Sequence, residues 1–335
     1  MRWMIRTLAI VAAVATIEVG GHLEKTRPLC SPLLSLASWT SLLSATAKST
    51  IPAPQLLKKT LIVAGDYSAG RTYAVGDRGL IFVSENDNSD WIVGETPTRR
   101  LLTGVASPDE NHAWAVGHDA VILFSSDGGQ TWIEQFSAPD EEAPLFGVWF
   151  DNPSRGIAFG AYGLIVETTD GGNTWTQKQI DEEGPHHYAL CESPTGSLYI
   201  AGEFGSVFRS EDKGRTWNKL PSPYGGTFFG ALALKDGSVL IFGLRGNLFR
   251  SDDEGENWSK LATGTTGSLL GGNQLSDGRV VIVGLNGITL ESRDGHTFTS
   301  SSRPDRLGHS TVVETPNQIL LFGEGGVRAW SPENK

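Results

Sequence analysis

The sequence predicts an all-β protein, a seven-bladed β-propeller built from four-stranded blades. Three observations support this fold class. A unit of several short apolar runs recurs seven times at intervals of 39 to 43 residues, which is the period of a propeller blade. The composition is rich in Gly (41) and Trp (10) and poor in Met (2), as expected for many strands joined by tight turns. The seventh unit supplies three strands, which predicts a ring closed by the opposite end of the chain.

Each unit places a Gly after an apolar strand, and these glycines mark the repeat. They are Gly76, Gly117, Gly160, Gly202, Gly243, Gly284 and Gly323. In the second unit the four expected strands are 101–107, 112–118, 120–127 and 131–137. Apolar residues largely alternate within them, and Gly, Asp, Asn and Pro separate them. One blade has no means of burying both faces, so neighbouring blades must pack against each other around an axis.

The two ends of the propeller are expected to meet in the last blade. Its three strands lie within residues 311–330, and the segment Ile51–Lys58 is expected to add the outer fourth strand. Closure of this kind leaves no open sheet edge in the ring. We therefore predict one domain, residues 48–335, acting as a monomer.

Residues 1–47 differ from the rest of the chain. Arg2 and Arg6 precede the apolar run LAIVAAVATIEV, which is the layout of an export signal. Candidate cleavage sites follow Ala15 and Ala47. The alternative is an uncleaved N-terminal anchor at the membrane. Both interpretations place the propeller outside the cytoplasm, in the periplasm or a lumen.

An eight-residue phrase, S/T-x-D-x-G-x-T-W, recurs in four units and begins with SSDGGQTW at 125–132. It resembles the Asp-box, or BNR repeat, and falls in the turn between the third and fourth strands. Its Asp accepts hydrogen bonds from turn amides, its Gly supplies positive φ, and its Trp buries a large ring. We assign these residues a structural role: Asp127, Trp132, Asp170, Trp175, Asp212, Trp217, Asp253 and Trp258. Decayed copies at 84–91 and 292–298 support this role, because a catalytic group would not be repeated with graded loss.

The full unit resembles the photosystem II stability/assembly factor family of propellers. The strings AWAVGHDAVILFSSDGGQTW (113–132) and FGAYGLIVETTDGGNTW (159–175) carry the resemblance, which extends over about residues 55–330. It implies a non-enzymatic exported scaffold that helps a membrane protein complex to assemble. Relatives outside photosynthesis imply accessory roles for other membrane complexes, including transporters. The later units match more loosely, so the resemblance does not fix the partner.

One face of the ring is expected to carry the binding surface. The turns between second and third strands open on the same face as the connections between blades, opposite the Asp-box turns. On a chain of net charge −11, this face gathers Arg, His and aromatic residues, which are typical of protein interfaces. The predicted partner-binding residues are Arg78, Arg99, Arg100, His118, Tyr162, His186, Phe204, Arg245, Arg306 and His309.

Other functions remain as alternatives. A sialidase-like glycoside hydrolase needs two carboxyl groups, or a Tyr–Glu pair with three arginines, on the inner strands. The expected inner strands are 61–65, 101–105, 145–150, 187–190, 228–233, 269–273 and 310–313, and they contain no Arg, Asp or Glu. We predict no catalytic residue, no cofactor and no metal site, although a glycan on the aromatic rim stays open. The acidic charge argues against a nucleic-acid partner.

Overall fold

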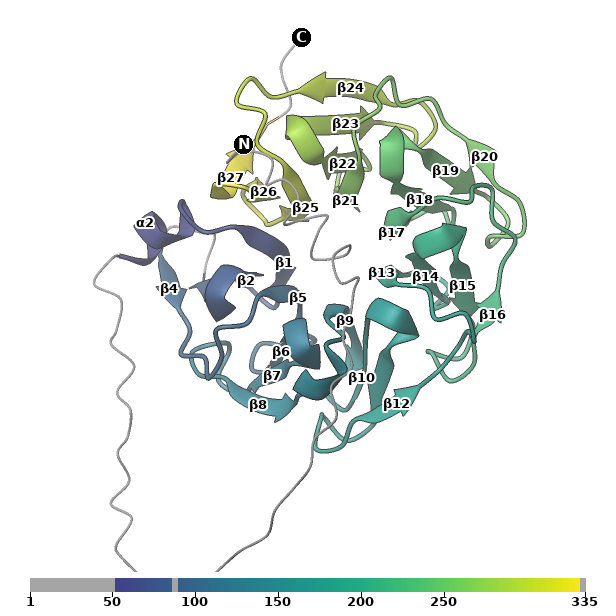
Figure 1. Cartoon of the computed structure of the whole chain (residues 1–335). Helices are drawn as coiled ribbons and strands as arrows, with labels where there is room; N and C mark the ends of the chain where they lie inside the picture. Colours follow the sequence, from purple (N-terminus) through teal and green to yellow (C-terminus); the bar gives the residue numbers. More distant parts are fainter. Residues whose placement is uncertain (1–51, 86–89, 332–335) are drawn as a thin grey trace, which may run out of the picture. The chain divides into compact units, whose positions relative to one another are not determined.

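The computed structural model describes residues 52–85 and 90–331, and in them seven antiparallel sheets are arranged around a central axis (Figure 1). The first blade contains β1 (Ile62–Ser68), β2 (Arg71–Gly76), β3 (Ile81–Glu85) and β4 (Trp91–Val93). The second contains β5 (Leu102–Ala106), β6 (Ala113–Gly117), β7 (Ile122–Ser125) and β8 (Ile133–Phe136). The third contains β9 (Leu145–Asn152), β10 (Arg155–Gly160), β11 (Ile165–Thr168) and β12 (Thr176–Lys178).

The remaining blades repeat this order. The fourth contains β13 (His187–Glu192), β14 (Leu198–Gly202), β15 (Val207–Ser210) and β16 (Asn218–Lys219). The fifth contains β17 (Phe228–Ala233), β18 (Val239–Gly243), β19 (Leu248–Ser251) and β20 (Ser259–Lys260). The sixth contains β21 (Leu269–Gln274), β22 (Val280–Gly284), β23 (Ile288–Ser292) and β24 (Thr299–Ser302). The seventh contains β25 (His309–Glu314), β26 (Ile319–Gly323) and β27 (Gly326–Trp330). The predicted all-β, seven-bladed propeller is confirmed.

The apolar core lies between blades. Along the second strand of each blade, alternate side chains point to opposite neighbours. In β2, Tyr73 and Val75 pack with Leu102 and Leu123 of the second blade, whereas Ala74 packs with residues of the seventh. One such cluster fills each junction, including the one between the last blade and the first. The ring is therefore held by contacts between neighbours, as the blade geometry requires.

The predicted closing strand is wrong. In place of a fourth strand for the seventh blade, the structure has a short helix, α2 (Ala53–Leu57). Pro52 and Pro54 explain the difference, because proline lacks the N–H that a ladder needs and is tolerated at the start of a helix. Leu57 is buried against Ile62 and Phe322 and so joins the first and last blades through side chains. Ile51 and the predicted export signal or anchor, residues 1–47, lie outside the described residues.

Five of the seven inner strands are longer than predicted, and the expectation that the inner strands lack acidic residues is wrong. They include Asp66, Asp151, Glu192 and Glu314 near their C-terminal ends. Asp66 accepts hydrogen bonds from the N–H and hydroxyl of Ser107, both at 3.0 Å. Within residues 52–85 and 90–331, no helix has the length and hydropathy to cross a membrane.

Candidate protein-binding face

On six blades the turn between the second and third strands is a single 3-10 turn whose middle residue has positive φ. In the first blade this turn is Asp77–Gly79, with φ of 58° at Arg78. The N–H of Asp77 donates to the carbonyl of Leu61 (3.0 Å), and the N–H of Leu80 donates to the carbonyl of Asp77 (3.2 Å). These middle residues, called tip residues below, are Arg78, Asp119, Tyr162, Phe204, Arg245 and Asn286. A non-glycine residue in this conformation costs about 1 kcal/mol, so each tip keeps its side chain at an energetic cost.

Each tip lies against the connection that leads to the next blade. A Cβ added to Gly79 would lie 2.3 Å from the carbonyl oxygen of Thr98, so only glycine fits there. The same Cβ would lie 3.2 Å from the Cα of Arg99, which places Arg78 and Arg99 at adjoining positions. Tips and connections therefore form one surface, called the connection face below.

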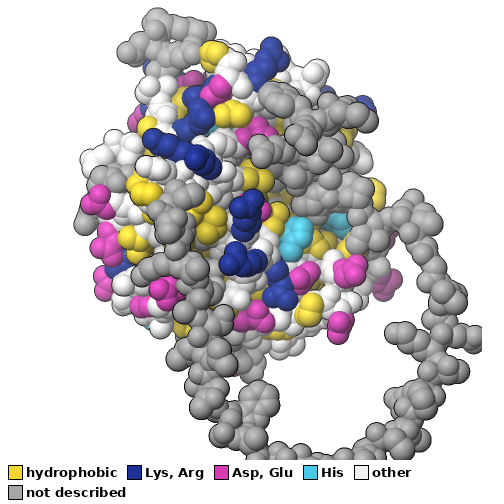
Figure 2. Space-filling view, turned by 60° about the vertical axis from the view of Figure 1, so that its left-hand side comes forward, with side chains coloured by type: hydrophobic (Ala, Val, Ile, Leu, Met, Phe, Trp, Pro, Cys, Tyr) yellow, Lys and Arg dark blue, Asp and Glu magenta, His cyan; other side chains and the backbone are white. Residues whose placement is uncertain are grey.

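Several arginines on the connection face are exposed. The side chain of Arg78 is 77% exposed, and its ion pair with Asp77 is long, at 3.5 Å. Arg99, Arg245 and Arg306 are exposed, and none has an ion pair or side-chain hydrogen bond with another described residue. In Figure 2, Lys and Arg side chains gather in a band across one face of the molecule, with His side chains beside them. Exposed guanidinium groups of this kind suit carboxylates.

Two predicted residues of this face, Arg100 and His118, are only partly exposed. The Arg100 Nε donates to the Oδ2 of Asp119 (2.6 Å), and its Nη1 donates to the Oε2 of Glu134 (3.3 Å). The charge of Arg100 is thus largely neutralised by its own blade. His118 is half-buried, and burial lowers its pKa.

Aromatic residues occupy the face over the third and fourth blades. Tyr162 and Phe204 are 61% and 73% exposed, which is unusual for rings of this size. The Nδ1 of His186 accepts a hydrogen bond from the backbone N–H of Tyr162 (3.0 Å), and the two rings meet edge to face at 4.8 Å. Burial lowers the pKa of His186, although Glu203 opposes the shift. A neutral His186 therefore supports the tip that carries Tyr162.

The prediction of His309 as a surface residue is wrong, because this side chain is fully buried. The inner strand of the seventh blade begins at His309, one residue earlier than expected. The first residue of each inner strand is buried, as Ile62 and Leu102 are in the first two blades. His187 takes the same buried position in the fourth blade.

Three aromatic residues beside this surface were not predicted from the sequence: Phe146, Tyr188 and Phe229. Each is the second residue of an inner strand, where the pairing with the next strand shifts register. The Phe146 and Tyr188 rings stack at 5.0 Å, and Tyr188 meets Phe229 at 5.3 Å. The repeat itself contained the signal, because an alignment of the inner strands puts all three in one column.

The Asp-box turns lie at the other end of the third strand and differ in character. The Oδ1 of Asp127 accepts bonds from the Ser125 hydroxyl (2.8 Å) and from the N–H groups of Gln130 and Thr131 (3.0 Å each). Asp170, Asp212 and Asp253 accept the same kinds of bonds in their own turns. Bonds from Thr174 hold the pKa of Asp170 below its ordinary value. Every carboxylate oxygen described here is used inside its turn.

The Trp residues of the phrase pack toward the preceding blade. Trp132 lies in the cluster between the first and second blades, and its indole N–H donates to the carbonyl of Gly129 (3.0 Å). Trp175, Trp217 and Trp258 pack against the three following junctions. In the decayed copies, Ser84 and Trp91 are buried while residues 86–89 are outside the described part, and Asp294 still accepts from Ser292 and Thr297.

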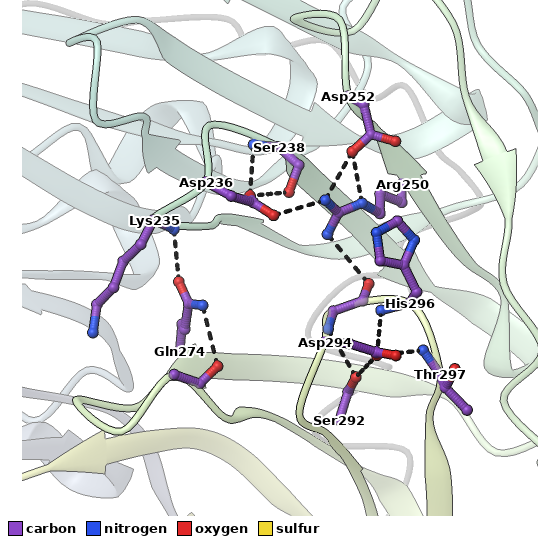
Figure 3. A network of polar contacts seen from close by, with 12 residues as sticks. Lys235, Asp236, Ser238, Arg250, Asp252, Gln274, Ser292, Asp294, His296 and Thr297 are labelled. Atoms are coloured by element: carbon purple, nitrogen blue, oxygen red, sulfur yellow. Dashed lines mark hydrogen bonds and ion pairs between the residues drawn. The ribbon is translucent and has the colours of Figure 1, made fainter.

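Long basic side chains tie these turns to the preceding blade. Figure 3 shows Arg250, which is 4% exposed and lies in β19. Its guanidinium donates to Asp236 and Asp252 (2.8 Å each) and to the carbonyl of Gly295 in the next blade (3.3 Å). The polar groups of the face that carries the Asp-box turns are therefore bonded within the protein, and they hold neighbouring blades together. The residues described include no group of His, Cys, Asp and Glu arranged to hold a metal ion.

Comparisons with known proteins agree with this architecture. The family model of the photosystem II assembly factor Ycf48 matches residues 134–290. The Ycf48 proteins of Synechococcus sp. strain JA-3-3Ab and of Thermosynechococcus vestitus are each 30% identical, over 140 and 101 residues. The resemblance to the photosystem II assembly factors is confirmed. These matches span 40% and 29% of this chain and 42% and 29% of the relatives, so less than half of either relative is covered.

Solved structures extend the likeness of fold over the propeller. A structure of Ycf48 bound to a D1 peptide aligns with a TM-score of 0.68 at 18% identity, covering 83% of this chain and 92% of that one. An ancestral GH74 enzyme aligns with a TM-score of 0.67 at 12% identity, covering 84% of this chain and 46% of the enzyme. The fold therefore occurs in assembly factors and in enzymes alike. Some assembly-factor relatives are named lipoproteins, among them that of Synechocystis sp. strain PCC 6803, 29% identical over 93 residues.

Proposed function

We propose that this chain is an exported, non-enzymatic scaffold that binds a membrane-protein subunit on its connection face, as an assembly factor of the photosystem II type. The observation that carries the proposal is the set of exposed arginines on one face of an acidic propeller, of which Arg99, Arg245 and Arg306 have no ion pair with another described residue. The assembly-factor relatives favour this function over a glycan-binding or hydrolytic one. We expect residues 48–335 to act as one propeller domain and residues 1–47 to act as an export signal or an N-terminal membrane anchor.

The D1 subunit of photosystem II is the first partner to test, because a Ycf48 structure of the same fold holds a D1 peptide. Electrostatics supports an acidic segment as the bound element. With a net charge of −11, the chain repels acidic segments over most of its surface. A carboxylate therefore binds most favourably at an arginine that has no ion pair, and we expect binding on the one face where such arginines lie.

Co-purification tests the proposal. The full chain serves as bait against detergent-solubilised membranes of a photosynthetic host, beside a variant with Arg78, Arg99, Arg245 and Arg306 changed to Glu. A control variant carries charge reversals in the Asp-box turns of the opposite face, at Arg215 and Arg293. We expect a D1-containing complex to be retained by the native chain and the control, and lost by the first variant. Retention by the connection-face variant would contradict the proposed surface, and no retention by the native chain would contradict the function.

A further inference from the structure

In two blades, the second residue of the inner strand forms a hydrogen bond to the neighbouring blade. There the strand pairing shifts register, so this residue stands outside the regular ladder. In the second blade the hydroxyl of Thr103 donates to the carbonyl of Leu145 in the third (2.5 Å). In the seventh blade the hydroxyl of Ser310 donates to the carbonyl of Ile62 in the first (3.2 Å). A small hydroxyl residue at this position thus links neighbouring blades.

Three adjacent blades carry large rings at this position instead. Phe146 (β9), Tyr188 (β13) and Phe229 (β17), called the aromatic arc below, lie side by side across neighbouring inner strands. None of the three is fully buried. A ring is not needed to link neighbouring blades, because Thr103 and Ser310 form these links with small side chains. The rings therefore call for another explanation.

The hydroxyl of Tyr188 supplies a second observation. It is shielded from solvent and has no hydrogen-bond partner among the described residues. Buried hydroxyl groups in native proteins nearly always have a partner, so this group is available to one supplied from outside the described residues. A phenylalanine would fill the same space without leaving a polar group unpaired.

The aromatic arc is continuous with the connection face. The His186 ring lies 6.0 Å from the rings of both Phe146 and Tyr188. On its other side His186 meets the exposed Tyr162 tip at 4.8 Å. A bound segment can therefore reach the aromatic arc while its neighbouring residues lie on the tips. The exposed arginines of the first, fifth and sixth blades border the same face.

We propose that the aromatic arc is the anchor site for one aromatic or branched aliphatic side chain of an acidic peptide segment bound to the connection face. The ring faces and edges of the aromatic arc hold the anchor side chain. The Tyr188 hydroxyl donates to a backbone carbonyl of the segment, and Arg78, Arg99 and Arg245 pair with its carboxylates. This inference rests on the proposed function and adds to it the kind of sequence that the scaffold selects.

The test uses the full chain and overlapping synthetic peptides that cover the D1 sequence. Affinities of any captured peptide are measured for the native chain, for Phe146→Ala and for Tyr188→Phe. Val63→Ala is the matched control, because Val63 holds the same strand position in the first blade. Thermal unfolding of each variant separates loss of binding from loss of the fold. Tyr188→Phe is the safer variant, since it removes only an unpaired hydroxyl.

We expect Phe146→Ala to weaken binding at least about tenfold and Tyr188→Phe to weaken it several-fold, with Val63→Ala unchanged. Replacing the anchor residue of the peptide by Ala should weaken native binding and abolish the difference between native and Phe146→Ala. Equal affinities for native and both aromatic-arc variants would overturn the anchor site while leaving the scaffold function standing. If no D1 peptide binds the native chain, the D1-directed function fails, and the anchor site assigned to it fails with it.

Discussion

The Asp-box turns and the tip turns are both hairpin turns repeated around the ring, and they lie at opposite ends of the third strand. The Asp-box turns repeat the same chemistry, and their carboxylates are saturated by bonds inside the turn. The tip turns repeat the same backbone, yet their middle residue changes from Arg to Asp, Tyr, Phe or Asn. Constant chemistry marks the fastening of the blades. Constant geometry with varied, exposed side chains fits the proposed binding surface.

The largest effect on stability is expected from the Asp-box side, at Trp132. This side chain is 4% exposed and fills the junction between the first two blades. Trp132→Ala should lower the free energy of unfolding by about 4 kcal/mol, because it leaves a large cavity. Chemical denaturation measures the change, with exposed Ile133→Ala as the control. A loss below about 1 kcal/mol would contradict the fastening role of the phrase.

A second large effect on stability is expected at two buried residues that differ from blade to blade. His187 and His309 stand where other blades have Ile, Leu or Phe, and burial lowers the pKa of each to about 4. Asp181 opposes the shift at His187, and Arg303 and Arg328 add to it at His309. Below pH 6.5 the unfolded chain binds protons that the folded chain excludes. Stability is therefore complete above that pH and falls as the pH drops toward 4.

We expect a loss of about 2 kcal/mol per histidine between pH 7 and pH 5. Denaturation midpoints measured across this range test the prediction, with the double variant His187→Leu/His309→Leu as the comparison. The double variant should lose distinctly less stability on acidification than the native chain. Parallel pH profiles for the two proteins would show that neither histidine is kept neutral by the fold.

A smaller effect is expected for a single Asp-box carboxylate. Asp127→Ala removes the acceptor of bonds from Ser125, Gln130 and Thr131. The turn groups regain water on this exposed face, so the cost should be about 1 kcal/mol, comparable with loss of a helix cap. Chemical denaturation again gives the value. Binding of the partner should not change, since the turn lies opposite the connection face; a lost affinity would mean that this face also takes part in binding.

Most of the fold could be predicted from the sequence, because the same pattern of strands and turns recurs in every copy of the repeat. The errors lie where one copy departs from the others. The segment expected to form the closing strand contains Pro52 and Pro54 and forms the helix α2. The inner strand of the seventh blade begins one residue earlier than expected, so His309 is buried. The aromatic arc was missed because its position is defined by a register shift, which has no signature within a single unit. Side-chain pairing such as that of Arg100 with Asp119 depends on rotamers that the pattern does not contain.

The smallest predicted effect is that of a substitution at the tip residue Phe204 that should raise stability and weaken binding. Phe204 is 73% exposed and has φ of 55°, so its ring contributes little to the core while its backbone is strained. Phe204→Gly should raise the free energy of unfolding by about 0.5–1 kcal/mol, because glycine adopts positive φ without the Cβ penalty. The same variant should bind the partner more weakly, since it removes an exposed ring from the connection face. Asn286→Gly is the control, because asparagine tolerates this conformation better and the gain should be smaller. A tip residue that weakens the fold and strengthens binding is retained for recognition; if Phe204→Gly bound as tightly as the native chain, the fourth blade would lie outside the contact area.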